Sequence, residues 1–177
     1  ATARYGSGDV QWMTAGAGIQ HAEMFPLTRP TAANRLELFQ IWLNLPAANK
    51  MVPPHFSMHW GANIPRRVFH DPEGRATDVT VYAGKLGDVA ALKPPPKSWA
   101  AGAKSDVAIF AIRLAAGAKW TLPKGPAAVN RALYVFAGDE LQVAGKAIAN
   151  NRMVRVKSDV DISLFGGLSG GEILMLQ

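Results

Sequence analysis

Residues 133–143 read LYVFAGDELQV, which is an apolar run, a Gly-Asp turn and a second apolar run. The two runs contain the aromatic and β-branched residues that favour strands, and the turn between them predicts a hairpin. Three further short runs follow at intervals of about ten residues, the spacing expected for strands joined by short turns. They are Val154–Val156, Val160–Phe165 and Glu172–Leu176. This pattern predicts an all-β fold, either a sandwich or a barrel.

The same strand pattern extends toward the N-terminus. Val79–Gly84 and Val107–Leu114 are β-prone runs, and Leu36–Leu45 is the most apolar run of the chain. Because the apolar residues of Leu36–Leu45 fall at both odd and even positions, we expect a central strand that is covered on both faces, with a buried helix as the alternative. Pro46 ends this run in either case.

A proline-rich stretch separates two β-rich blocks and predicts two modules. Five prolines lie within residues 46–76, which otherwise contain few apolar runs. We therefore expect a boundary between two modules near residues 46–65.

Composition excludes several classes of protein. The 177 residues include 17 glycines and 12 prolines, too many for a helical bundle, and no cysteine that could form a disulfide or bind a metal. No apolar run reaches the roughly 18 residues of a membrane span, so we expect no membrane association. The net charge of +6 is spread along the chain, and without a basic cluster we expect no direct nucleic-acid binding. The absence of cysteine is compatible with a cytoplasmic location.

His21 and Glu23 are the residues that best fit a metal site. They lie in Ile19–Met24, a run with an extended pattern, after the flexible loop Gly16-Ala17-Gly18. In a strand, residues two apart leave the same face, so the imidazole and the carboxylate would converge. Such a pair is half of a first-row metal site. The alternative is an ordinary surface pair at the end of a strand.

The remaining histidines do not form a second metal site in this interpretation. His55 and His59 follow two prolines, so an extended chain would hold them roughly 13 Å apart. We expect each to be a surface or packing residue, and His70 to lie in a turn. Residues 71–177 contain no histidine, which excludes a histidine-based metal site in the second half.

The stretch GDVQWMTAGAGIQHAEM, residues 8–24, closely resembles the signature of the pirin family. Residues 38–47 (LFQIWLNLPA) and 50–54 (KMVPP) resemble its next conserved stretch. The resemblance implies a bicupin, built from two jelly-roll-like double-stranded β-helices of the cupin class. It also implies one metal in the first cupin, most often Fe(II), although another divalent transition metal is possible. His21 and Glu23 match two ligands of that metal. The other two belong to a preceding His-x-His strand that this chain does not contain, so the chain is expected to be an internal fragment. The resemblance then implies the later part of the first cupin domain at residues 1–50, a connector at residues 51–65 and the second cupin domain at residues 66–177.

The resemblance implies quercetin 2,3-dioxygenase activity, in which a ring of a small aromatic substrate such as a flavonol is opened by reaction with O2. His21 would bind the metal, and Glu23 would be a metal ligand or the catalytic base that takes the flavonol proton. A second possibility is an iron-dependent, redox-sensing protein that binds transcription factors or regulates metabolic enzymes. A third is that this part of the protein is only a scaffold.

Overall fold

The computed structural model describes residues 2–177, and its regular elements are strands and three short 3-10 turns. The turns are η1 (Ala47–Asn49), η2 (Gly61–Asn63) and η3 (Trp99–Ala101). No helix in this part of the chain has the length and apolar character needed to cross a membrane. The strands are β1 (Val10–Thr14), β2 (His55–His59), β3 (Arg66–His70), β4 (Ala76–Ala83), β5 (Lys85–Leu86), β6 (Val89–Ala90), β7 (Ile109–Leu114), β8 (Lys119–Leu122), β9 (Arg131–Gly138), β10 (Gln142–Val143), β11 (Lys146–Ala147), β12 (Arg152–Val156), β13 (Ile162–Phe165) and β14 (Gly171–Leu176).

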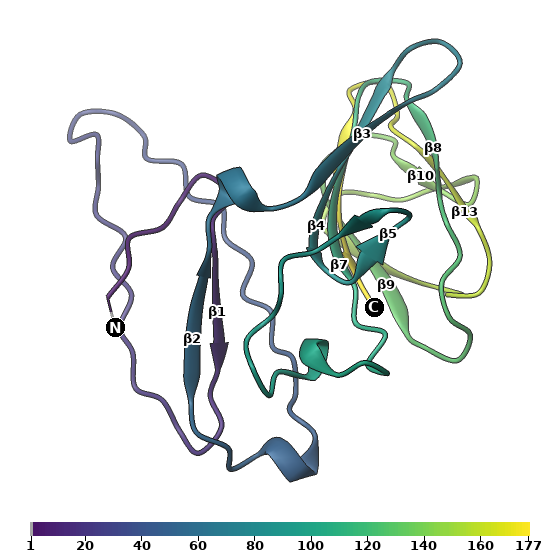
Figure 1. Ribbon diagram of the computed structural model, residues 1–177. Helices are drawn as coiled ribbons and strands as arrows, with labels where there is room; N and C mark the ends of the chain where they lie inside the picture. Colours follow the sequence, from purple (N-terminus) through teal and green to yellow (C-terminus); the bar gives the residue numbers. More distant parts are fainter. Residues whose placement is uncertain (1) are drawn as a thin grey trace.

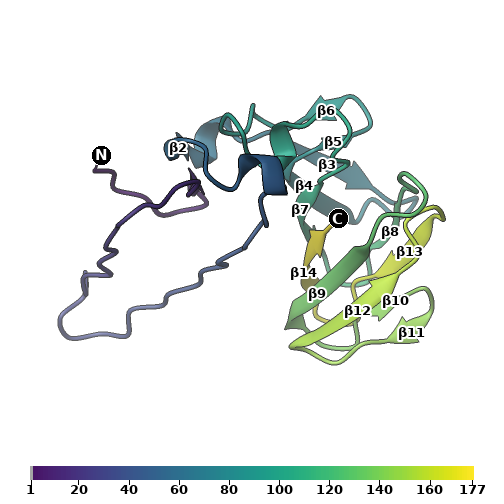
Figure 2. The ribbon, with the colours of Figure 1, turned by 90° about the horizontal axis from the view of Figure 1, so that it is seen from below.

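Two antiparallel sheets form a sandwich from β3 to β14, as Figures 1 and 2 show. The larger sheet has the order β12-β9-β14-β7-β4-β3, and the smaller has the order β11-β10-β13-β8. β5 and β6 form a separate short hairpin. The expected all-β fold is therefore confirmed.

Alternation of small or apolar residues with polar ones explains why these strands pack as they do. In β4, Thr77, Val79, Val81 and Ala83 are buried, whereas the residues between them are only partly buried. A strand with this period presents one face to the core. The two sheets bury between them a continuous aliphatic core, whose largest members are Val79, Val81, Ile112, Leu114, Leu122, Leu133, Val135, Leu141, Ile173 and Met175.

The N-terminal segment lies against the other face of the larger sheet. β1 pairs with β2, and Trp12 of β1 packs against a second apolar cluster of Ala83, Ile109 and Leu174. The rings of Phe39 and Phe136 meet edge to face, with centroids 4.7 Å apart. β2 falls within residues 51–65, which were predicted to be a connector, and the division into two domains stays a prediction.

The strand expected at Leu36–Leu45 is absent, and so is the one expected at Ile19–Met24. No strand or helix occurs between Ala15 and Pro46, and Figures 1 and 2 show this segment as a long loop. Several of its apolar side chains are exposed, including Leu36 at 63% and Trp42 at 87%. The prediction was wrong because apolar composition indicates a need for burial, whereas a strand also needs a hydrogen-bonding neighbour. Within residues 2–177 no strand pairs with this segment.

The predicted hairpin around Gly138 is also wrong, although both of its strands exist. β9 pairs with β12 and β14 in the larger sheet, whereas β10 pairs with β11 and β13 in the smaller one. Gly138 has a φ of 103°, and a Cβ there would lie 2.2 Å from the carbonyl oxygen of Gly170. A glycine is therefore required where the chain crosses from one sheet to the other.

Candidate metal centre

The loop after β1 sets the start of the segment that carries His21 and Glu23. The Thr14 hydroxyl donates to the carbonyl of Pro96 at 3.3 Å, and the amide of Ala17 donates to the carbonyl of Val52 at 2.9 Å. Gly16 has a φ of 52°, and a Cβ there would lie 2.0 Å from the Val52 oxygen. This tight approach requires glycine at position 16.

His21 and Glu23 are both exposed in the irregular segment that follows. Because this segment is not a strand, the two-residue repeat of a strand does not place their side chains on one face. Glu23 Oε1 accepts a hydrogen bond from the Tyr5 hydroxyl at 2.8 Å. Within residues 2–177, no hydrogen bond or ion pair joins His21 to Glu23.

Tyr5 is a partner of the candidate site that sequence reasoning missed. Desolvation raises the pKa of its phenol first, and the hydrogen bond to the Glu23 carboxylate raises it further. The phenol therefore stays protonated and acts as the donor in this pair. No sequence pattern indicated the contact, because Tyr5 and Glu23 are 18 residues apart and neither lies in a regular element.

The other histidines lie in regular strands. His55 and His59 occur in β2, which confirms the expected extended chain, and His70 ends β3 instead of lying in a turn. His59 is buried, and its ring centroid lies 5.8 Å from that of Trp12. Desolvation lowers the pKa of His59, and a hydrogen bond with the backbone of Lys93 opposes this only in part. His59 is thus a packing residue in the described structure.

The donors present fit a first-row metal in type but are too few in number. An imidazole and a carboxylate are common ligands of iron and related ions. No group of three or more His, Cys, Asp or Glu side chains with metal-site geometry occurs among residues 2–177. These residues therefore do not form a complete ligand shell by themselves.

Comparison with solved structures defines the fold class. The structure matches a quercetin 2,3-dioxygenase from Acinetobacter baumannii with a TM-score of 0.64 and 20% identity, covering 96% of this chain and 55% of that one. The two stacked antiparallel sheets are those of a cupin.

Sequence comparison gives the family within that class. The family model described as Pirin matches residues 1–43. One "Putative quercetin 2,3-dioxygenase" of Pseudomonas aeruginosa is 42% identical over 87 residues, covering 49% of this chain and 29% of the relative. A second protein of the same name and organism is 30% identical over 177 residues, covering 96% of this chain and 55% of the relative. The chain belongs to the pirin family, and it spans about half the length of that second relative.

Proposed function

We propose that the protein is a metal-dependent dioxygenase of flavonols such as quercetin, and that His21 and Glu23 belong to its reaction centre. Its membership of the pirin family and the names of its relatives support the reaction type. The exposure of both side chains supports their access to a ligand.

The contact between Tyr5 and Glu23 is the observation that carries this proposal. The Glu23 carboxylate accepts a hydrogen bond from the phenol hydroxyl of Tyr5 at 2.8 Å. A flavonol presents the same kind of donor, a hydroxyl on a conjugated ring. A carboxylate within hydrogen-bond reach of that hydroxyl can accept its proton. We assign this role of general base to Glu23, with metal ligation as the alternative role.

The metal in this proposal is Fe(II), or another divalent transition metal, held by His21 and Glu23 together with ligands from outside residues 2–177. Such an ion, when bound, supplies the redox-active centre that O2 chemistry needs. The proposal includes the division into a first cupin domain at residues 1–50, a connector at residues 51–65 and a second cupin domain at residues 66–177. It also includes a cytoplasmic location.

The test is O2 consumption by the intact, iron-loaded protein in the presence of quercetin. We expect activity that is lost in Glu23→Gln and retained in Glu37→Gln, which alters an exposed glutamate of the same segment. Iron binding without O2 consumption for any flavonol tested would overturn the enzymatic proposal. It would favour the redox-dependent binding of a protein partner instead.

A further inference from the structure

A groove of about 660 Å³ lies on the outer face of the smaller sheet, away from His21 and Glu23. Lys119, Phe165 and Gln142 line it in a single row, because Phe165 is the register partner of both of the others. Thr121 and Ser163 are paired in the neighbouring row. His70, at the end of β3, lines it as well. Its volume falls in the range of small-molecule sites in proteins.

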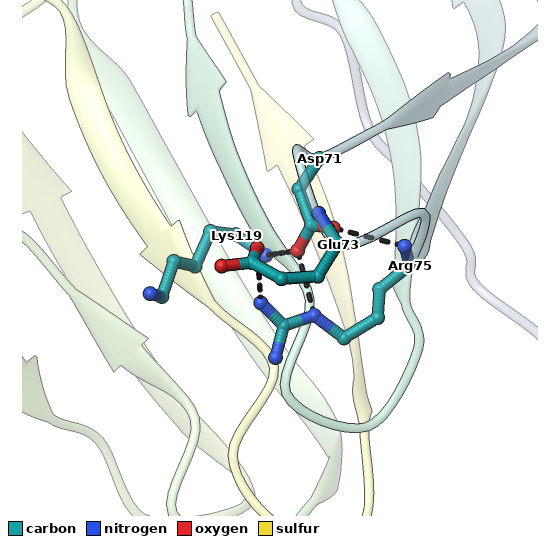
Figure 3. A network of polar contacts seen from close by, with 4 residues as sticks. All are labelled: Asp71, Glu73, Arg75 and Lys119. Carbon is teal, nitrogen blue, oxygen red and sulfur yellow. Dashed lines mark hydrogen bonds and ion pairs between the residues drawn. The ribbon is translucent and has the colours of Figure 1, made fainter.

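The turn between β3 and β4 fixes one wall of the groove. The Asp71 side chain is only 1% exposed, and its two oxygens accept hydrogen bonds from the backbone amides of Glu73, Arg75 and Lys119 and from Arg75 Nε (Figure 3). The bond from Lys119 attaches the turn to the first residue of β8. The wall is therefore held in place without any ligand.

The turn that forms this wall contains two carboxylates and one guanidinium. Desolvation alone would raise the pKa of the Asp71 carboxyl, but the hydrogen bonds from the Arg75 and Lys119 amides and from the Arg75 guanidinium outweigh it, so the pKa is lowered. Glu73 accepts a second bond from the same guanidinium at 2.6 Å. The two carboxylates share the single Arg75 guanidinium, so the turn keeps a net charge of −1 beside Lys119.

Apart from Asp71, the polar side chains inside the groove have no hydrogen-bonding partners in the part of the chain that the structure describes. Within residues 2–177, no hydrogen bond or ion pair engages the side chain of Lys119, Thr121, Gln142, Ser163 or His70. Figure 3 shows the Lys119 side chain extending away from Asp71, with its ammonium group free. The groove thus combines one ammonium group without an ion-pair partner, one partly buried aromatic ring and several free hydrogen-bonding groups.

We propose that this groove binds a small anionic ligand that carries a hydroxylated aromatic ring. The Lys119 ammonium would pair with a carboxylate, and the Phe165 ring would contact the ring of the ligand. Gln142, Thr121 and Ser163 would bind its hydroxyl groups. Trp120 and Leu164 also line the groove, and both pack in the core between the two sheets. The proposal is independent of the flavonol reaction.

Titration with 3,4-dihydroxybenzoate, followed by amide NMR shifts and calorimetry, tests this site. We expect saturable shifts at Lys119, Phe165 and Gln142. Lys119→Gln should weaken binding by roughly three- to tenfold, as expected for one charge-assisted contact. Lys124→Gln is the matched control, because Lys124 is exposed just beyond β8 and does not line the groove. Ser163→Ala supplies a second, mild change on the outer face.

Three further probes make the ligand class falsifiable. Catechol lacks the charge and benzoate lacks the hydroxyls, so both should bind more weakly than 3,4-dihydroxybenzoate. Glucuronate lacks the aromatic ring, and stronger binding of glucuronate would overturn the proposal in favour of a saccharide site. The absence of saturable shifts in the groove, or equal affinity in Lys119→Gln, would also overturn it.

Discussion

The Tyr5 hydroxyl donates to Glu23 Oε1 at 2.8 Å, joining the chain before β1 to the irregular segment that follows it. This contact holds one oxygen of the carboxylate and leaves the other without a partner within residues 2–177. A carboxylate oriented in this way could bind a metal ion or accept a proton through its second oxygen.

Tyr5→Phe is expected to weaken metal binding by roughly tenfold, because donors that orient a ligating carboxylate commonly contribute that much. Its free energy of unfolding should change by no more than about 0.5 kcal/mol, as for most surface substitutions. Isothermal titration with Fe(II) under anaerobic conditions measures the first effect, and urea denaturation measures the second. Unchanged or tighter metal binding would show that Tyr5 does not position Glu23.

Leu133→Ala is expected to destabilise the protein by roughly 2–5 kcal/mol, the usual cost of an emptied core position. Leu133 is fully buried between the two sheets. Leu38→Ala removes the same atoms from a side chain that is 49% exposed in the irregular segment and should cost far less. Urea unfolding of both variants checks the comparison. A similar loss in Leu38→Ala would mean that this segment is buried in solution.

His59 is expected to make stability depend on pH near neutrality. Its pKa in the folded state lies below the ordinary 6.5, so the unfolded chain binds more protons as the pH falls through that range. Stability should be greatest above pH 6.5 and should decrease as the pH falls toward the lower, folded-state value. The urea midpoint at several pH values measures this dependence.

His59→Gln should flatten the pH dependence, because glutamine does not titrate. His55→Gln is the control, since His55 is exposed on the same strand. A slope that persists in His59→Gln would assign the effect to another group.

Asp71→Asn is expected to destabilise the turn between β3 and β4. Both carboxylate oxygens of Asp71 accept hydrogen bonds, whereas an amide has only one acceptor oxygen. Four donors point at the Asp71 carboxylate. The lowered pKa of Asp71 also predicts that its contribution is present above the ordinary value of 3.8 and is lost as the pH falls below it. Thermal unfolding should show a larger loss for Asp71→Asn than for Glu73→Gln, whose carboxylate is exposed. An equal loss would contradict the central role of Asp71.

The short strands of the second half could be predicted because each apolar or alternating run is bounded directly by turn residues. β4, β7, β12, β13 and β14 correspond to runs that glycine, proline or Asp-containing turns delimit. The pairing partner, however, is not a local property. Gly138 predicts a change of direction, but only its approach to Gly170 decides that the chain enters the other sheet.

The difference between local pattern and non-local contact also explains why the irregular N-terminal segment and the groove were not predicted. Leu36–Leu45 has the composition of a buried strand, but no described strand pairs with it. An extended chain was expected at His55–His59, but its pairing with β1 is not a local property of the sequence. Asp71-Pro72-Glu73-Gly74 is a recognisable turn sequence, yet its contact with Lys119 spans 48 residues and depends on tertiary structure.

The iron content of the intact protein after anaerobic Fe(II) loading tests the proposed reaction centre most directly. We predict near-stoichiometric iron in the parent protein and in Glu37→Gln, and a large loss in His21→Ala and Glu23→Gln. Full retention of iron in both His21→Ala and Glu23→Gln would contradict the assignment of these residues to the metal centre.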